Sequence, residues 1–307
     1  MTIKQTMTGS EIIVEVLAEQ GVETIFGYSG GAILPTYDAV FQYNEKHKNA
    51  MPLIVPANEQ GAGFMASGYS RATGKPGIVM VTSGPGATNT VTPVRDAMAD
   101  SIPMIVICGQ VNRSSIGSDA FQEAPITSVM GSVAKHVFLV TDEDKLAATM
   151  RAAFEISTSG RPGPVVVDIP KDIQTASINF DISSTLNINA YRERVQSIIN
   201  NRLSDEDCER FFDYLKASSR PLIYSGGGTI AADASEELRK FSARLQLPVT
   251  TTLMGIGAID TQAELSLQML GMHGTAFANY AVEDCDFIIA LGSRFDDRVA
   301  ALPKEFA

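Results

Sequence analysis

The chain has 307 residues, of which 45% are hydrophobic and 19% are charged, and this length suits about two globular domains with sizeable cores. A net charge of −11 argues against nucleic acid or an anionic membrane as a partner, and no apolar run approaches a membrane span. The three cysteines are widely separated and form no CxxC pair, and the three histidines are too scattered to suggest a metal site. We therefore expect a cytoplasmic protein.

The first half of the chain alternates helices with short apolar strands. Thr8 and Glu11 have the spacing of a capping box and predict a helix that continues to Gly21. Further helices are expected after Gly31, from Asn58, after the loop at 83–89 and over 142–159. Strands are expected at 24–27, 53–55, 78–81, 103–108 and 164–170, with 53–55 buried. This alternation predicts an α/β fold with a mainly parallel sheet that is covered on both faces.

Four loops follow directly on predicted strands, at residues 28–31, 56–59, 83–89 and 109–113. In parallel sheets the ligand site lies at the carboxyl ends of the strands. We therefore expect these four loops to gather at one edge of the sheet.

The helix that begins at Glu59 has little side-chain bulk, because small residues occupy most positions between 61 and 68. Each glycine costs roughly 1 kcal/mol of helix propensity relative to alanine, so another helix or a flat ligand must approach closely. Glu59 itself allows two interpretations. It is either a carboxylate that stabilises the helix N-terminus, or a semi-buried catalytic carboxylate whose protonated form is favoured by apolar neighbours.

A polar stretch at about 172–202 is typical of an interdomain linker, and a second α/β unit follows. Helices are predicted at 205–217, 234–245 and 276–282, and strands at 220–224, 247–251 and 287–291. A unit with about three strands is expected to be incomplete.

Three loops have both a chemical and a structural interpretation. Residues 83–86 are either an anion cradle at a helix start or a tight turn, and residues 226–228 are either a phosphate contact or a turn. Arg294 and Arg298 flank two aspartates after a predicted strand. They either bind a charged ligand or form an ordinary solvated ion-pair network.

Motifs along nearly the whole chain resemble the catalytic subunits of acetohydroxyacid synthase (acetolactate synthase), a family of thiamine-diphosphate enzymes. They include Glu59-Gln60-Gly61-Ala62, Asp119-Ala120-Phe121-Gln122-Glu123 and Leu270-Gly271-Met272-His273-Gly274. The others lie at residues 26–35, 82–89, 101–103, 160–165, 170–172 and 292–298. The motifs at 270–274 and 292–298 separate this family from most other thiamine-diphosphate enzymes. The resemblance implies a pyrimidine-binding domain at 1–175, a linker at 176–198 and an incomplete central FAD-binding domain at 199–307.

The resemblance also implies an activity and partners. Pyruvate would be decarboxylated and condensed with a second 2-ketoacid, pyruvate or 2-ketobutyrate, to give 2-acetolactate or 2-aceto-2-hydroxybutyrate for valine, leucine and isoleucine biosynthesis. The family forms homodimers or tetramers of catalytic subunits, with a small regulatory subunit. One alternative is another thiamine-diphosphate and FAD enzyme, such as a pyruvate oxidase or a sulfoacetaldehyde acetyltransferase. A second is a non-catalytic nucleotide-binding or regulatory module.

The family's site residues carry over by position. Glu59 matches the glutamate that hydrogen-bonds the aminopyrimidine ring of thiamine diphosphate and stabilises its imino tautomer. Gly31 lies where the family's backbone approaches the reacting carbons, Gln122 matches an active-site glutamine, and Lys171 a lysine at the substrate channel. The implied FAD contacts are Arg161, Gly227, Gly228, Met272, His273, Gly274, Gly292, Arg294, Asp296 and Arg298.

The chain departs from the family pattern in several places. Ser29 replaces a proline, Asn58 replaces a histidine, and residues 124–130 differ from the commonest sequence. The Gly-Asp-Gly motif that binds the diphosphate through Mg²⁺ is absent. We therefore expect an N-terminal fragment of a longer subunit, without metal ligands and inactive by itself.

Overall fold

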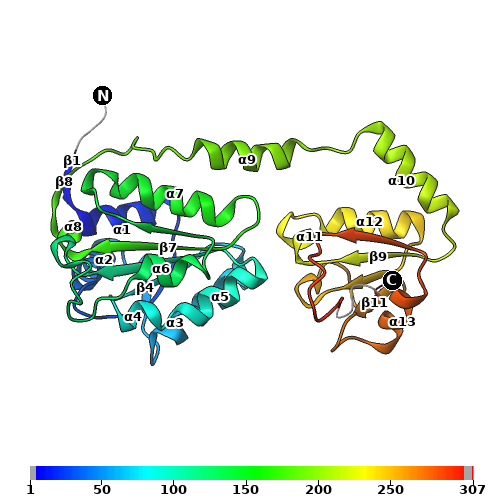
Figure 1. Cartoon of the computed structure of the whole chain (residues 1–307), viewed down its shortest axis with the longest axis horizontal. Coiled ribbons are helices and arrows are strands. Elements are labelled where there is room, and N and C mark those ends of the chain that lie inside the picture. Colours follow the sequence, from blue (N-terminus) through cyan, green and yellow to red (C-terminus); the bar gives the residue numbers. More distant parts are fainter. Residues whose placement is uncertain (1–4, 301–305, 307) are drawn as a thin grey trace. The chain divides into compact units, whose positions relative to one another are not determined.

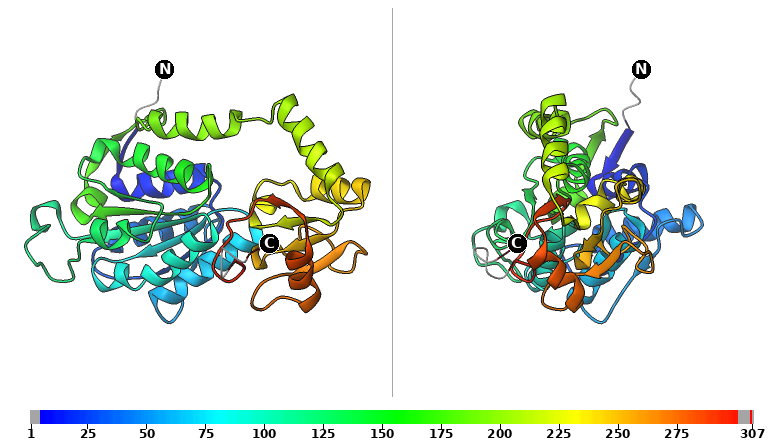
Figure 2. Two further views of the ribbon diagram at one scale, coloured as in Figure 1. Left: turned by 45° about the vertical axis from the view of Figure 1, so that its right-hand side comes forward. Right: turned by 90° about the vertical axis from the view of Figure 1, so that its right-hand side faces the viewer.

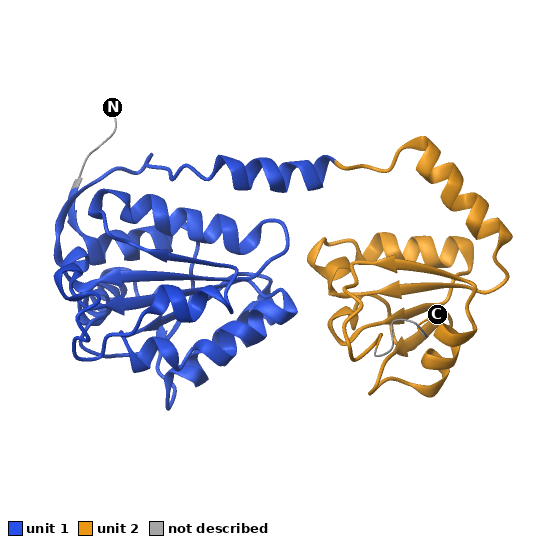
Figure 3. Cartoon of the chain, viewed as in Figure 1, with its two compact units in different colours: residues 1–200 blue, residues 201–307 orange. Residues whose placement is uncertain are grey.

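A computed structural model describes residues 5–300 and 306 of the chain. The chain divides into two compact units, residues 1–200 (unit 1) and residues 201–307 (unit 2), as Figure 3 shows. The domains expected from the sequence begin at residue 1 and end at residue 307, so their outer ends lie outside the described residues.

Unit 1 is built on a six-stranded parallel sheet in the order β3-β2-β4-β5-β7-β6 (Figure 1). Its strands are β2 (Ile25–Tyr28), β3 (Leu53–Ile54), β4 (Gly77–Val81), β5 (Met104–Gln110), β6 (His136–Leu139) and β7 (Pro164–Pro170). β4, β5 and β7 are buried along their whole length. Strands covered on both faces are rich in apolar side chains, which explains why these three stand out in the sequence.

Helices cover both faces of this sheet (Figures 1 and 2). They are α1 (Gly9–Glu19), α2 (Leu34–Lys46), α3 (Glu59–Thr73), α4 (Pro85–Thr88), α5 (Val91–Asp100), α6 (Ile126–Gly131), α7 (Leu146–Thr158) and α8 (Lys171–Thr175), with 3₁₀ turns η1 (Arg113–Ser115) and η2 (Glu143–Lys145). α9 (Asn189–Asn200) follows β8 and has no buried residue. α1, α2 and α7 share one apolar core with the sheet, and α3 and α5 lie on the opposite face (Figure 1). The predicted capping box is confirmed, because the Thr8 hydroxyl accepts from the Glu11 N–H and the Glu11 carboxylate accepts from the Thr8 N–H.

A separate antiparallel pair joins the start of unit 1 to its end. β1 (Gln5–Thr8) pairs with β8 (Ser177–Phe180), with Thr8 opposite Ser177. The segment expected to be a linker therefore contains β8 and α9, both of which belong to unit 1.

Unit 2 contains a four-stranded parallel sheet in the order β11-β10-β9-β12. The strands are β9 (Pro221–Ser225), β10 (Val249–Thr251), β11 (Ser266–Met269) and β12 (Phe287–Leu291), and the helices are α10 (Asp205–Ala217), α11 (Gly227–Ala231), α12 (Ser235–Leu245) and α13 (Ala276–Asp284), with the 3₁₀ turn η3 (Leu253–Gly255). Two apolar clusters form its core, one around Ile223 and Val249 and one around Leu222 and Tyr224.

The predicted α/β class with parallel sheets is confirmed, but the edges of the sheets differ from the sequence-based prediction. The expectation that residues 53–55 form a buried strand is wrong. β3 pairs only with β2, and Ile54 and Val55 are 41% and 56% exposed. The sequence analysis also missed β1, β6, β8 and β11, and unit 2 has four strands where about three were expected.

Candidate active site

The loops that follow β2, β3, β4 and β5 meet at the carboxyl-terminal edge of the unit 1 sheet. The Ala32 N–H donates to the Thr82 hydroxyl at 3.2 Å, which joins the β2 loop to the end of β4. A Cβ added to Gly30 would lie 2.4 Å from Thr82 Cγ2, and one added to Gly109 would lie 2.6 Å from the Ala32 carbonyl oxygen. Only glycine allows such close approaches. The prediction that these loops gather at one edge is confirmed.

Glu59 is the first residue of α3, and it is half-buried at this edge. Asn58 forms the N-cap, and its side-chain oxygen accepts from the Gly61 N–H at 2.8 Å. Because this cap serves the helix end, the Glu59 side chain is available for other contacts. Its Oε2 accepts a 2.9 Å hydrogen bond from Asn89 Nδ2, in the loop after β4.

A tyrosine from α2 lies within electrostatic reach of this carboxylate. Tyr37 is buried, and its hydroxyl donates to the Met80 carbonyl oxygen at 3.0 Å. Burial and, secondly, the negative charge of Glu59 raise the pKa of Tyr37. Tyr37 therefore stays a neutral hydrogen-bond donor that fixes the end of β4 behind Glu59.

Two glycines in the loop after β4 are required by contacts within the chain. Gly84 has a φ of 55°, and a Cβ added there would lie 2.4 Å from the Gln122 carbonyl oxygen. A Cβ on Gly86 would lie 2.7 Å from Thr82 Cγ2 and 3.5 Å from Glu59 Oε1. These contacts explain both glycines as parts of a tight turn, which is the structural interpretation of residues 83–86. They also leave the Glu59 carboxylate uncovered on the side of Gly86.

The other predicted catalytic residues lie at the same edge of the sheet. Gly31 is exposed, and no atom lies within 4 Å of a Cβ added there. Gln122 is exposed and adopts a left-handed φ of 58° beside Gly84. Lys171 directly follows β7 and is exposed. The neighbouring Asp172 accepts hydrogen bonds from the backbone N–H and Nε of Arg113 at 3.0 and 2.6 Å. The structure thus gathers Glu59, Gly31, Gln122 and Lys171 at one edge.

Arg161 lies elsewhere in unit 1. It precedes β7, and its guanidinium donates to the Ser101 hydroxyl at 2.8 Å and to the Met98 carbonyl oxygen at 2.9 Å. These groups stand at the end of α5, just before β5. Arg161 is therefore at the amino-terminal edge of the sheet, opposite Glu59, and it binds the last carbonyl groups of a helix.

The predicted FAD residues of unit 2 follow its strands. Gly226 and Gly228 pack against Gly292, since a Cβ on either would lie under 3 Å from the Gly292 backbone. Gly292 has a φ of 60°, and a Cβ there would lie 2.4 Å from the Thr229 nitrogen. The turn interpretation of residues 226–228 accounts for Gly227 as well, where a Cβ would lie 2.8 Å from Met254 Cβ.

The polar residues of this edge lie just past these glycines. The Met272 N–H donates to the Arg298 carbonyl oxygen at 2.9 Å, so the two segments are adjacent. Arg294 lies 4.0 Å from the Asp296 carboxylate, and Arg298 lies 3.3 Å from that of Asp297. The Met272, His273, Arg294 and Arg298 side chains are exposed, and Gly274 packs on the Met269 and Leu270 backbone.

Several residues that shape the unit 1 site were missed by the sequence analysis. Asn89 and Tyr37 contact or influence Glu59, and neither has a pattern that predicts this. The buried polar residues Gln110, Asp168 and Gln174 hold the loops from beneath. A charged residue inside the apolar run at 165–169 was the available signal for Asp168.

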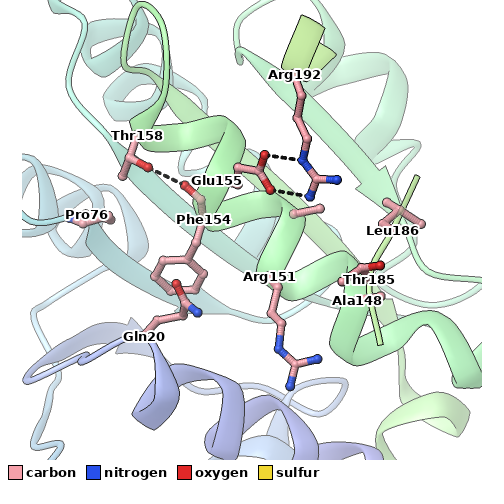
Figure 4. A pocket seen from close by; sticks show the side chains of 11 residues that line it. Gln20, Pro76, Ala148, Arg151, Phe154, Glu155, Thr158, Thr185, Leu186 and Arg192 are labelled. Carbon is pink, nitrogen blue, oxygen red and sulfur yellow. Dashed lines mark hydrogen bonds and ion pairs between the residues drawn. The ribbon is translucent and has the colours of Figure 1, made fainter. Parts of the chain in front are cut away.

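A cavity of about 460 Å³ lies on the surface of α7, and it contains none of the predicted site residues. Its charged side chains pair with one another or with neighbours. Arg192 lies 2.6 Å from Glu155, as Figure 4 shows, and Arg151 pairs with Glu19 at 2.8 Å. Because these charges are already compensated, the loop edge is the better candidate for an active site.

Two models of one protein family match the chain. Residues 7–130 match the N-terminal TPP binding domain of thiamine pyrophosphate enzymes, and residues 208–307 match the central domain of these enzymes. The chain therefore belongs to the thiamine pyrophosphate enzyme family. No helix among the residues that the structure describes is long and apolar enough to cross a membrane.

Within that family the chain is similar to acetolactate synthases. It is 47% identical over 308 residues to the mitochondrial acetolactate synthase catalytic subunit of Saccharomyces cerevisiae, covering 98% of this chain and 43% of that protein. It is 44% identical over 303 residues to the chloroplastic acetolactate synthase of Arabidopsis thaliana, covering 99% of this chain and 44% of that protein. With the acetolactate synthase large subunit of Parasynechococcus marenigrum the identity is 45% over 305 residues, covering 99% of this chain and 48% of that protein. The chain spans less than half the length of these curated relatives.

The geometry around Glu59 fits the aminopyrimidine end of thiamine diphosphate. Asn89 holds Oε2, and among the described residues none donates a hydrogen bond to Oε1. A side chain at Gly86 would approach that oxygen, and a Cβ added to Gly31 would meet open space at the β2 loop. In unit 2, exposed arginines beside the strand ends fit a ligand that carries phosphate groups.

Proposed function

We propose that this chain is the N-terminal part of an acetolactate synthase catalytic subunit, a transferase that acts on pyruvate. The observation that carries the proposal is the placement of Glu59. It stands half-buried at the start of a glycine-rich helix, held by Asn89, at the edge where the strand loops meet. The relatives named above support acetolactate synthase over a pyruvate oxidase, a sulfoacetaldehyde acetyltransferase or a non-catalytic module.

The residues of this edge have distinct roles in the proposal. Thiamine diphosphate, when bound, supplies the electron sink for decarboxylation. The Glu59 carboxyl group would hydrogen-bond a ring nitrogen of the bound cofactor and hold or release a proton at Oε1, while Asn89 fixes Oε2. Gly31 lets the backbone of the β2 loop approach the reacting carbons. Gln122 and Lys171 contact the 2-ketoacids, pyruvate and 2-ketobutyrate.

The diphosphate and its Mg²⁺ would be bound by residues outside this sequence. Among the described residues, no group of three or more His, Cys, Asp or Glu side chains could hold a metal ion. In the proposal, this chain contributes the contacts to the aminopyrimidine ring. Those contacts would act across an interface between two catalytic subunits in a dimer or tetramer, to which a small regulatory subunit also binds.

FAD is proposed as the ligand of unit 2. Arg294 and Arg298 would bind its phosphates, and Asp296, Met272 and His273 would contact the rest of the cofactor. Gly227, Gly228, Gly274 and Gly292 would keep the strand ends free of side chains. Arg161 lies in unit 1, so its contact with FAD depends on how the two units are arranged. The three unpaired cysteines suit a reducing compartment, which we take to be the cytoplasm.

An assay of acetolactate formation tests the proposal. We expect the 307-residue chain alone to form no acetolactate from pyruvate, even with thiamine diphosphate and Mg²⁺, because it lacks the diphosphate ligands. The subunit completed to the length of its relatives should be active in a colorimetric acetoin assay. Robust product formation by this chain alone would contradict the proposal that residues outside this sequence bind the diphosphate and its Mg²⁺. Oxygen consumption by the complete subunit with pyruvate, without acetolactate, would instead favour the oxidase.

A further inference from the structure

A buried glutamine ties together the two ends of the loop that carries Gln122. Gln110 ends β5 and is 3% exposed. Its side-chain Nε2 donates to the Ala124 carbonyl oxygen at 3.2 Å, and its Oε1 accepts from the Val111 N–H at 2.9 Å. Residues 111 and 124 are the first and last of this loop. One amide group therefore closes the loop at its base.

The loop between these points is braced internally. The Glu123 carboxylate accepts hydrogen bonds from the backbone N–H groups of Gly117 and Ala120, and these bonds lower the pKa of Glu123. Asp119 and Gln122 both adopt left-handed backbone conformations, with φ of 55° and 58°. Such conformations persist only where the surrounding contacts impose them. These internal contacts link Gln122 to the rest of the loop, so the contacts at its base, together with the Arg113 ion pairs to Asp172 and Glu143, place Gln122.

The Gln110 amide also donates a hydrogen bond to Asp168. Asp168 lies on β7, opposite Cys108 of β5, and is 1% exposed. Its Oδ2 accepts from Gln110 Nε2 at 2.9 Å, whereas among the described residues Oδ1 has no hydrogen-bond partner. Burial raises the pKa of Asp168 to about 7, although the Gln110 hydrogen bond opposes the shift.

One titratable group lies at the paired position beside Asp168, and others lie on α5, which also packs against β7. On α5, Arg95 is exposed, and Asp96 and Asp100 pair with Arg71 at 3.1 and 2.7 Å. The Cys108 thiol is the group at the paired position, and burial and the charge of Asp168 raise the pKa of that thiol. β6 presents Leu139 at the paired position, and α6 carries no titratable side chain. The charge of the buried pair Asp168 and Cys108 near neutral pH is therefore the charge of Asp168.

We propose that Gln110, supported by Asp168, is a positioning residue that fixes the 111–124 loop and thereby sets the place of Gln122 at the active site. When Asp168 is ionised, Gln110 donates to a carboxylate, and charge-assisted hydrogen bonds are roughly twice as strong as neutral ones. Protonation weakens this bond and loosens the amide that holds Ala124. The inference rests on the proposed function only for the role of Gln122, and the test below does not use activity.

A single tryptophan can report on the loop, because the chain contains none. Phe121 is 88% exposed at the loop tip, so Phe121→Trp places the probe without disturbing packing. In this background we expect acrylamide quenching of the tryptophan to rise as the pH falls through about 7, because the weaker neutral hydrogen bond lets the loop open more often. Asp168→Asn keeps an oxygen that accepts from Gln110 but does not titrate, so its quenching should not depend on pH in this range.

Gln110→Leu removes both loop contacts and should increase quenching and amide hydrogen exchange across residues 111–124 at every pH. The matched control is Gln174→Leu. Gln174 is also buried, and its Nε2 donates to the Ala32 and Ile169 carbonyl oxygens. That variant removes a similar buried amide and should leave the 111–124 loop unchanged.

Equal quenching in Gln110→Leu and its parent would overturn the proposal. So would a Gln174→Leu variant that loosens the loop as much as Gln110→Leu does. The same pH profile in Asp168→Asn and its parent would overturn it as well. If Gln110→Leu does not fold, the comparison of Asp168→Asn with its parent decides by itself. A catalytically inactive complete subunit with a pH-sensitive loop would reject the proposed function and leave the positioning role intact.

Discussion

The glycines at the two candidate binding edges serve different purposes. Around Glu59 in unit 1, Gly86 faces the Thr82 and Glu59 side chains, and Gly63 faces Pro93. In unit 2, Gly226, Gly228 and Gly292 face one another's backbones. Gly86 thus lies beside the carboxylate that we propose to be catalytic, whereas Gly226, Gly228 and Gly292, like Gly84 and Gly109 of unit 1, bring loops into direct backbone contact. The first arrangement suits a catalytic site, and the second suits a rigid surface on which a ligand binds.

The largest effect should follow from changing Glu59. In the complete subunit, Glu59→Gln should lower turnover by about two to three orders of magnitude, as is usual when a general acid–base group is lost. The fold should survive, because Asn58 rather than Glu59 caps α3. Hydrogen–deuterium exchange at the thiazolium C2 of bound cofactor checks the assignment. An unchanged exchange rate in the variant would assign Glu59 to helix stabilisation only.

Asp168 should make the stability of unit 1 depend on pH, in a way that unit 2 does not share. Its folded-state pKa is raised from 3.8 to about 7. The folded state therefore keeps a proton that the unfolded state loses, so stability falls as the pH rises from about 4 to about 7 and then levels off. The full shift corresponds to at most about 4 kcal/mol. In urea unfolding, the free energy of unfolding of Asp168→Asn, taken relative to that of the parent, should be higher at pH 8 than at pH 4. A difference that does not change with pH would contradict the raised pKa.

A matched pair of glycine substitutions sharpens the contrast between the units. Gly292→Ala should destabilise unit 2 by about 2 kcal/mol or more, because it combines a left-handed φ with a backbone clash at Thr229. Gly86→Ala should also destabilise, but its closest contact is the Thr82 methyl group. Adding Thr82→Ser removes that methyl group and keeps the hydroxyl that accepts from Ala32, so we expect it to restore most of the loss. Failure of this rescue, measured by urea unfolding, would show that the backbone also limits space at Gly86.

The smallest effect concerns the proposed FAD contact. Arg294→Ala in the complete subunit should weaken FAD binding about ten-fold, since a charge-assisted hydrogen bond contributes about 1.5 kcal/mol or more. Flavin fluorescence titration measures the affinity. Arg210→Ala is the control, because Arg210 lies on α10 in an exposed pair with Asp207. Equal affinities for Arg294→Ala and the parent would make Arg294 a partner of Asp296 only.

The sequence by itself determined the α/β class, the central strands and the position of Glu59. β4, β5 and β7 are buried on both faces, so apolar residues dominate them apart from the hydrogen-bonded Gln110 and Asp168, and such runs are visible without a structure. Glu59 was visible because it follows a strand and begins a helix of small residues. The outer strands β6 and β11 are less buried, so exposed or polar side chains are tolerated there and the apolar pattern weakens.

Only the tertiary structure decided what surrounds Glu59. Asn89 is 30 residues away in sequence and Tyr37 lies on another helix, and both reach Glu59 because parallel strands end at one edge. Gln110 and Asp168 are 58 residues apart and meet because β5 and β7 are neighbours. Sequence periodicity reports which face of an element is buried. It does not report which strand lies beside which, and hydrogen bonds between buried polar groups depend on that order.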